Sequence, residues 1–376
     1  MTNKPTVVDL FCGAGGLSHG FQQAGYEVRF GTDIDSTFGK TFMASHPHAR
    51  FVAKPIQELS VDEVLLASGL QAGEIDVLVG GPPCQGYSVY NHGRGEHDPR
   101  AGLFREYLRL VVGLRPKWLV MENVTGLISI AGGQLVEQIV NEIKAAGFRD
   151  VEFQILKAEN YGVPQERRRI VFIANRLGLP VRFPVFSHGG EKNAFTTVWD
   201  AIGDLPPISD QWQFENGAWY EAPPKNEYQK LMRKKSNIVE NHYGPRLGNA
   251  NLDRIKYIPP GGSWRDVPFE LLPAGMQKAK RSDHTKRYGR PRQTDLSCTI
   301  LTKCDIHWGA YIHPVQDRAF TVREAARIQS FPDDFVFYGS MTEQFVQVGN
   351  AVPPLMAKAI ADQILQVEAG IVSIAA

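Results

Sequence analysis

A short β-branched run, a glycine-rich turn and an amphipathic segment open the chain in that order, and similar alternation continues through residues 1–180. Strands that alternate with helices in this way favour an α/β fold, with a mostly parallel sheet and helices on both faces. The predicted strands are Thr6–Leu10, Val28–Gly31, Asp76–Val79, Trp118–Met121 and Ile170–Ala174, and the predicted helices are Leu17–Ala24, Leu103–Leu114 and Leu135–Ala146.

The pattern changes after about residue 180. Residues 181–290 are rich in Pro, Gly, Asn and aromatic side chains and show little periodicity, which predicts a smaller, irregular domain. Helical signals return in a capping box at Thr321–Glu324 and in a Pro-initiated helix from Pro353 to about Val367. With 376 residues, too many for one comfortable core, we expect a first domain of 1–180 plus 340–376, a second domain of 181–320 and a hinge at 321–339.

Composition narrows the class of protein. Lys and Arg number 41 against 40 Asp and Glu, so net charge argues neither for nor against a nucleic-acid partner. The four cysteines form no CxxC pair and no zinc spacing, so we predict no metal site and a reducing compartment. The sequence has neither a signal peptide nor an apolar run of membrane-spanning length, and we therefore expect a soluble cytoplasmic protein with no membrane partner.

The first glycine-rich turn has the features of a cofactor site. Asp9–Gly16 lies between a strand and a helix, and Asp33 follows about twenty residues later at the end of the next strand, where a carboxylate can bind ribose hydroxyls. The spacing is GxGG rather than GxGxxG, which disfavours a dinucleotide. Taken alone, this segment is compatible with NAD, FAD or S-adenosylmethionine, or with a turn that binds nothing.

A second loop carries a candidate nucleophile. Gly80–Ser88 follows a predicted strand directly and places Cys84 where ligands gather in parallel sheets. A lone cysteine is more often a small core residue. Glu122 also follows a strand, and Arg167 and Arg169 alternate at the start of another, so both arginines are expected to face one side.

These segments together resemble the DNA (cytosine-5)-methyltransferases, of the bacterial restriction–modification type. The resemblance rests on DLFCGAGG, GGPPCQGYS, ENV, QERRR, RPRQTDLSCTIL, REAARIQSFP and VGNAVPP, which run in the family's order over nearly the whole chain. It implies a Rossmann-like methyltransferase domain and a smaller target-recognition domain, here the first and second domains above. It also implies methyl transfer from S-adenosylmethionine, with S-adenosylhomocysteine as product, to C5 of a flipped-out cytosine in a specific duplex sequence.

The family's residue roles carry over to matching positions. Cys84 resembles the thiolate that adds to cytosine C6, Glu122 the acid at N3 and N4, and Arg169 the contact to O2, with Arg167 as its companion. The residues expected at the cofactor are Phe11, Gly13, Gly15, Gly16, Asp33, Ile34, Ile56, Pro83, Leu103, Asn350 and Val352.

One position departs from the family pattern. Members usually carry an Asp-Ile pair at the adenine ring, and here Lys54-Pro55-Ile56 stands in its place. Ile56 can still pack on adenine, whereas Pro55 cannot accept a hydrogen bond from the exocyclic amine.

A basic stretch from Lys278 to Arg292, interleaved with His284, Tyr288 and the nearby Trp264, predicts contacts to double-stranded DNA. An exposed loop with solvated charge is the alternative. The residues expected at DNA are Gln85, Ser88, Arg100, Lys280, Arg281, Lys286, Arg287, Tyr288 and Arg290. A monomer is expected, and a cognate restriction endonuclease is a further candidate partner. The competing functions are methylation of tRNA cytosine, a catalytically silent DNA-binding relative and a nicotinamide dehydrogenase.

Overall fold

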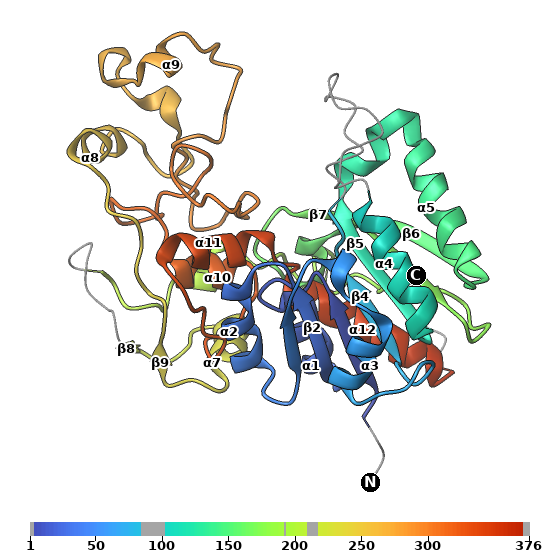
Figure 1. Cartoon of the computed structure of the whole chain (residues 1–376). Coiled ribbons are helices and arrows are strands. Elements are labelled where there is room, and N and C mark those ends of the chain that lie inside the picture. Colours follow the sequence, from blue (N-terminus) through green and yellow to red (C-terminus); the bar gives the residue numbers. More distant parts are fainter. Residues whose placement is uncertain (1–3, 84–101, 192, 209–216, 371–376) are drawn as a thin grey trace. The chain divides into compact units, whose positions relative to one another are not determined.

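The computed structural model describes residues 4–83, 102–191, 193–208 and 217–370 (Figure 1). The chain forms two compact units. Unit 1 is Met1–Lys157, Arg168–Phe186 and Val352–Ala376, and unit 2 is Ala158–Arg167 and Ser187–Ala351. The expected hinge at 321–339 therefore lies inside unit 2, because its helix is buried there, and the chain passes between the units after residues 157, 167, 186 and 351. The functional division into catalytic and recognition domains stays a prediction.

Unit 1 contains a seven-stranded sheet of order β3-β2-β1-β4-β5-β7-β6. Pairing is parallel from β3 to β5, while β7 runs antiparallel to both β5 and β6, so the predicted mostly parallel sheet is confirmed. The strands are β1 Thr6–Leu10, β2 Glu27–Asp33, β3 Arg50–Ala53, β4 Val77–Gly80, β5 Trp118–Val124, β6 Asp150–Lys157 and β7 Arg168–Asn175.

Helices cover this sheet (Figure 1). They are α1 Gly16–Gln23, α2 Ser36–Ser45, α3 Val61–Ser68, α4 Leu103–Leu114, α5 Gln134–Ala145 and α12 Pro354–Glu368, with 3-10 turns η1 Ile56–Glu58 and η3 Thr125–Gly133. The expected helices at α1, α4, α5 and α12 are confirmed within about two residues. Helices α2 and α3 and strands β3 and β6 were not predicted from the sequence, because they are short or lack a clear apolar face.

Two glycines fix the packing of unit 1 at close approaches. A Cβ at Gly20 in α1 would lie 2.4 Å from the Ala357 Cβ in α12, so the α1–α12 crossing requires a residue without a side chain. A Cβ at Gly80, the last residue of β4, would lie 2.4 Å from the Leu10 carbonyl oxygen. The ends of β1 and β4 are therefore held together where the two predicted site loops begin.

Unit 2 is irregular, as expected for residues 181–290. Its elements are η4 Ala158–Tyr161, α6 Val198–Ile202, β8 Ala218–Trp219, α7 Glu227–Arg233, β9 Ile238–Val239, α8 Asn249–Ile255, η5 Trp264–Asp266, η6 Phe269–Leu271, α9 Ala274–Gln277, α10 Val322–Ile328 and α11 Met341–Asn350. Strands β8 and β9 form a two-stranded sheet. Thr321 caps α10 through a capping box with Glu324, which confirms the predicted helix start.

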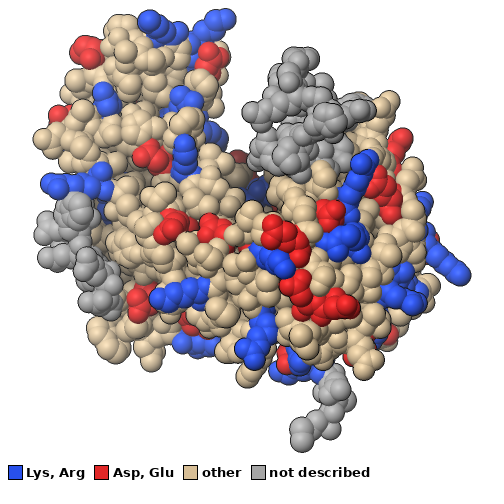
Figure 2. Space-filling model, viewed as in Figure 1, with Lys and Arg blue, Asp and Glu red and all other residues tan. Residues whose placement is uncertain are grey.

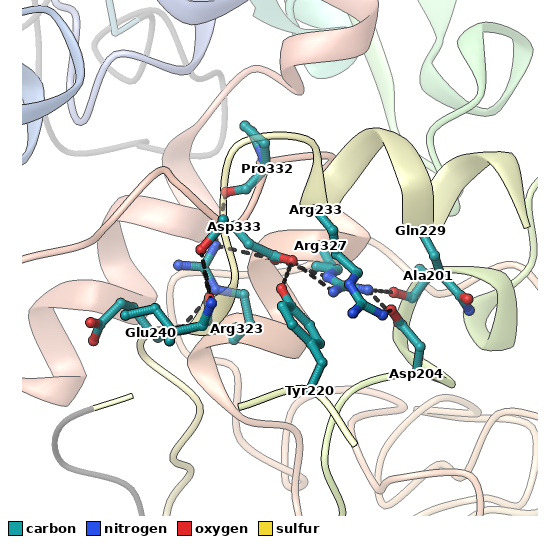
Figure 3. A network of polar contacts seen from close by, with 12 residues as sticks. Ala201, Asp204, Tyr220, Gln229, Arg233, Glu240, Arg323, Arg327, Pro332 and Asp333 are labelled. Atoms are coloured by element: carbon teal, nitrogen blue, oxygen red, sulfur yellow. Dashed lines mark hydrogen bonds and ion pairs between the residues drawn. The ribbon is translucent and has the colours of Figure 1, made fainter. Parts of the chain in front are cut away.

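The charged side chains of α10 are inside unit 2. Arg327 donates to both carboxylate oxygens of Asp333, at 2.9 and 2.7 Å, and to Asp204 at 2.6 Å (Figure 3). Asp333 also accepts from the Tyr220 hydroxyl. Nearby, Arg323 donates to the carbonyls of residues 240, 332 and 335. Buried charges need such complete pairing, so this network holds the loops of unit 2 together.

No helix within the described residues has both the length and the apolarity required to span a membrane.

Candidate active site

The glycine-rich turn after β1 is built by backbone hydrogen bonds to β2. Phe11 has a positive φ of 65°, and the Cys12 amide donates to the Thr32 carbonyl at 3.0 Å. The Gly13 amide donates to the Asp33 carboxylate at 2.9 Å. Two of the residues predicted at the cofactor, Gly13 and Asp33, are thus in direct contact although twenty positions separate them.

Gly15 precedes α1 with a φ of 96°, a conformation that favours glycine. A Cβ there would lie 2.9 Å from the His46 Nε2 atom, so the turn is also sterically closed to larger residues. The next residue, Gly16, begins α1 and is buried. The α1 N-terminus therefore starts directly at the turn, as the sequence predicted.

Asp33 has the environment of a ligand-binding carboxylate. Burial raises its pKa, while hydrogen bonds from the Asp35 and Gly13 amides act in the opposite direction. Each carboxylate oxygen has one amide donor and retains capacity for a second, which suits a ribose hydroxyl. The next side chain, Ile34, is 72% exposed and offers an apolar surface beside it.

Asp9 lies inside the same turn. Its Oδ2 atom accepts from the Ser18 hydroxyl at 2.6 Å, and its buried Oδ1 atom has no hydrogen-bond partner among the described residues. Burial raises the pKa of Asp9 to about 7, against the effect of the Ser18 hydrogen bond. The exposed Ile34, the acceptors of Asp33 and this unpartnered oxygen fit a ligand that has both apolar and hydrogen-bonding parts.

The segment before Cys84 is anchored to β5. The Asn123 side-chain amide donates to the Pro82 carbonyl at 2.8 Å, and both residues are buried. Pro83, predicted at the cofactor, is exposed. Cys84, Gln85, Ser88 and Arg100 lie outside the described residues. The sequence analysis gave no role to Asn123, although its place directly after Glu122 at a strand end was a usable signal.

Glu122 and Arg169 form an ion pair, with 2.6 Å between Oε1 and Nε and side chains 14% and 15% exposed. The strand register explains the pairing. Val124 of β5 lies opposite Arg169 of β7, and Glu122 lies two residues before Val124, on the same face. A Cβ on Gly81 would lie 3.1 Å from the Glu122 Oε2 atom, so this pair lies beside the segment that leads to Cys84.

Arg167 differs from its prediction. Strand β7 begins at Arg168, so Arg167 precedes it and belongs to unit 2. Its side chain is buried and donates to the carbonyls of Ile300, Gly349 and Ala351, at 2.8–3.2 Å. The expectation that Arg167 and Arg169 start one strand is wrong, because unit 2 uses Arg167 to hold its own backbone.

The other residues predicted at the cofactor have mixed environments. Ile56 is 4% exposed and is part of the apolar core of unit 1, against which Leu103 packs. Val352 is buried in unit 1, while Asn350 is exposed and belongs to unit 2. Of these residues, only Asn350 presents an exposed polar side chain.

The basic stretch predicted at DNA divides into exposed and buried residues. Lys280, Arg281 and Lys286 are exposed and Arg287 is half-buried. Tyr288 and Arg290 are buried, which contradicts their prediction as DNA contacts. Arg290 donates to the carbonyls of residues 255, 258, 313 and 316 and pairs with Asp317, so its guanidinium is used within unit 2. Trp264 is also buried and donates to the carbonyl of residue 284.

Comparison with known proteins identifies one family. A family model described as C-5 cytosine-specific DNA methylase matches residues 5–366. The type II methyltransferase M1.HphI of Haemophilus parahaemolyticus is 35% identical over 96% of this chain and 87% of its own length. The type II methyltransferase M.AgeI of Thalassovita gelatinovora is 32% identical over 95% of this chain and 98% of its own.

A solved structure agrees with these sequence similarities. A prophage-encoded protein of E. coli, described as a DNA modification methyltransferase, superposes with a TM-score of 0.77 at 26% identity and covers 97% of this chain and 100% of its own. The similarity therefore includes both compact units and not the glycine-rich turn alone.

Proposed function

The chain belongs to the C-5 cytosine-specific DNA methylases, which methylate cytosine in DNA with S-adenosylmethionine as the general donor, and we propose that it modifies cytosine within a specific duplex sequence through a covalent adduct with Cys84. The nicotinamide dehydrogenase considered from the glycine-rich turn is set aside by this family membership. A cytoplasmic location, a monomeric state and pairing with a cognate restriction endonuclease, by analogy with the type II relatives, belong to the proposal.

The observation that carries the mechanism is the Glu122–Arg169 pair beside Gly81. Two side chains and one backbone segment of unit 1 meet at one edge of the sheet. They are the acid of β5, the guanidinium of β7 and the segment leading to Cys84, which Asn123 anchors at Pro82. Ligands of parallel sheets bind at the carboxyl ends of the strands. Strands β4 and β5 both end at this edge.

Each group has a distinct part in this proposal. The Cys84 thiolate forms a bond to cytosine C6, which places negative charge on the ring and makes C5 nucleophilic. Glu122 in its protonated form donates to N3 and neutralises that charge. Arg169 uses Nε on Glu122 and Nη1 on the Arg168 carbonyl, and among the described residues its Nη2 has no partner and is available for O2.

The remaining steps restore the base. S-adenosylmethionine, when bound, would supply an electrophilic methyl group, with its S–CH3 bond breaking as the C5–CH3 bond forms and S-adenosylhomocysteine as the leaving group. The N3 proton then returns to Glu122. A base then removes the C5 proton, and the electron pair of that C–H bond re-forms the C5–C6 double bond as the Cys84 thiolate leaves. In this proposal the glycine-rich turn, Asp33 and Ile34 hold the donor in line with C5.

The test is transfer of a tritiated methyl group to unmethylated duplex DNA, with RNA in parallel. Cys84→Ser removes the nucleophile, and Cys298→Ser makes the same chemical change in unit 2 as the matched control. We expect label in DNA as 5-methylcytosine from the wild type and the control only. Label confined to RNA would contradict the duplex proposal, and full activity of Cys84→Ser would contradict the adduct.

A second readout tests the adduct directly. DNA in which 5-fluorocytosine replaces the target base should form a complex with the wild type that survives denaturation, because the C5 fluorine cannot leave as a proton does. Neither Cys84→Ser nor omission of the donor should give that complex. Methylation without a trapped complex would reject the covalent route and leave the overall reaction intact.

A further inference from the structure

Trp308 is an exposed aromatic side chain in a region of unit 2 whose other aromatic residues are buried. It is 50% exposed, whereas Tyr288, whose amide is hydrogen-bonded to Ile306, and Tyr311, three residues after Trp308, are 1% and 0% exposed. A single exposed aromatic side chain is common on protein surfaces, so exposure alone does not mark a contact, and the rigid turn and the two cations at this ring carry the inference.

The backbone around Trp308 is fixed. The Tyr288 amide donates to the Ile306 carbonyl at 2.6 Å, and the Trp308 amide donates to the Asp305 carbonyl at 2.9 Å. A Cβ at Gly309 would lie 2.5 Å from the Tyr311 ring, so the turn after Trp308 requires glycine. The indole is therefore presented on a rigid turn and needs little ordering when it binds.

Two cations lie at this ring. The Arg287 Cζ atom is 5.0 Å and the Lys303 Nζ atom 5.8 Å from the Trp308 centroid, both within the range of cation–π contact. Neither cation has a carboxylate partner among the described residues. The nearby Asp305 carboxylate is hydrogen-bonded to the His307 ring instead. An aromatic side chain beside two cations that lack carboxylate partners offers an apolar surface for base edges in a groove and positive charge for the flanking phosphates.

Charge alone would not have located this site. Figure 2 shows Lys and Arg interspersed with Asp and Glu over the visible face. Within the basic stretch, Arg281 donates to the Arg265 carbonyl at 2.6 Å, and Arg290 is buried. Of the arginines predicted at DNA in unit 2, only Arg287 has a guanidinium without a hydrogen bond or ion pair to a described residue.

We propose that Trp308, held between the turn 305–309 and the cations Arg287 and Lys303, is a DNA-contact residue that determines target choice. The indole contacts the bases of the target site, and the two cations bind the flanking phosphates. Trp308 and Lys303 lie beyond the basic stretch from which the sequence predicted DNA contacts. This inference rests on the proposed modification of a specific duplex sequence and concerns its recognition, whereas the methylation chemistry does not depend on Trp308.

The experiment compares Trp308→Ala with Trp219→Ala, a matched control in the same unit whose side chain is 74% exposed and has no cation contact in the described structure. The target is first read by sequencing the methylated cytosines of DNA treated with the wild type. Binding is then measured by titration of a labelled duplex that contains this target and of a scrambled duplex of equal length. Circular dichroism checks that each variant folds.

For Trp308→Ala we expect the ratio of target to scrambled affinity to fall about 5- to 100-fold, the range for loss of the readout of one base pair. Trp308→Phe should recover most of that ratio. Arg287→Ala and Lys303→Ala should weaken both duplexes and each lower the salt dependence of binding by about one unit. If Trp308→Ala and Trp219→Ala have the same affinity ratio and methylate the same sites, Trp308 does not read the target.

Discussion

Replacing Arg327 with Met should strongly destabilise unit 2 and leave unit 1 unchanged. Arg327 is fully buried and makes four hydrogen bonds, to Asp204 at 2.6 Å, to Ala201 at 2.9 Å and to Asp333 at 2.9 and 2.7 Å. Methionine fills a similar volume, so the change removes charge and hydrogen bonds rather than packing. Two buried carboxylates then lose their main partner (Figure 3).

The expected loss of stability depends on the partners that Asp204 and Asp333 retain. Breaking a buried pair by removing one partner costs about 3–5 kcal/mol. Asp204 retains Arg233 at 3.1 Å, and Asp333 retains the Tyr220 hydroxyl and the ion pair with Arg323 at 3.9 Å. Because each acid keeps at least one partner, we expect about 3 kcal/mol, the lower end of that range. Adding Asp333→Asn should recover part of the loss, since it removes a charge that would otherwise be buried without its arginine.

The assay is hydrogen exchange under native conditions, because two compact units make a single unfolding free energy ill-defined. Peptides that cover Val322–Ile328 should exchange on the order of 100-fold faster in Arg327→Met. Peptides of β1 and β4 provide the internal control, and Lys256→Met, at the exposed pair with Asp253, is the matched variant and should leave the exchange rates nearly unchanged. A change of less than about threefold at α10 would show that the network does not hold unit 2 together.

Three further outcomes are expected. Glu122→Gln should lower kcat for methylation about 100-fold or more, because an amide cannot give its proton to N3, and steady-state kinetics with unaltered DNA affinity would show it. Asp33→Asn should raise KM for S-adenosylmethionine about tenfold or more and change kcat little. A fall in kcat with KM unchanged would contradict a role for Asp33 in binding the donor. Burial lowers the pKa of His313 from 6.5 to about 4. The neutral imidazole therefore contributes fully to folding stability above pH 6.5, and this contribution is lost as the pH falls toward 4, because the unfolded chain takes up the proton first. Relative to His313→Asn, the wild type should lose about 1 kcal/mol of stability in unit 2 per pH unit in that window, measured by hydrogen exchange of the α10 peptides in both proteins at the same pH. A relative gain on acidification would contradict the assignment.

The proposed catalytic edge of unit 1 could be predicted from the sequence because its residues lie at strand ends. Glu122 lies near the end of β5 and Arg169 near the start of an adjacent antiparallel strand, so both fall on one edge once the sheet order is known. The sequence placed each residue at a strand terminus from local pattern alone. The direction of β7 could not be read from the sequence, so the ion pair between Glu122 and Arg169 was not predicted.

The Gly13–Asp33 contact was predictable for the same reason. Both residues lie at the ends of neighbouring parallel strands, and the spacing of about twenty residues reflects one helix between them. The partner of Asn123 was not predictable in this way, because a proline carbonyl 41 positions earlier in the chain gives no signal in composition or periodicity.

Unit 2 shows why arginine identity is a poor guide to DNA contacts in an irregular domain. A sheet satisfies its carbonyls through its own ladder, whereas loops need other donors. Here the donors are buried guanidinium groups, each bonded to backbone carbonyls: Arg167, Arg290, Arg318, Arg323 and Arg327. Their partners lie up to 184 positions away along the chain, so no local pattern separates such an arginine from one that faces a phosphate. Arg290, which is structural, lies in the same stretch of sequence as the arginines proposed at DNA. The useful criterion is therefore whether a guanidinium already has carbonyl or carboxylate partners, and by that criterion Arg287 beside Trp308 replaces Arg290 as a candidate DNA contact.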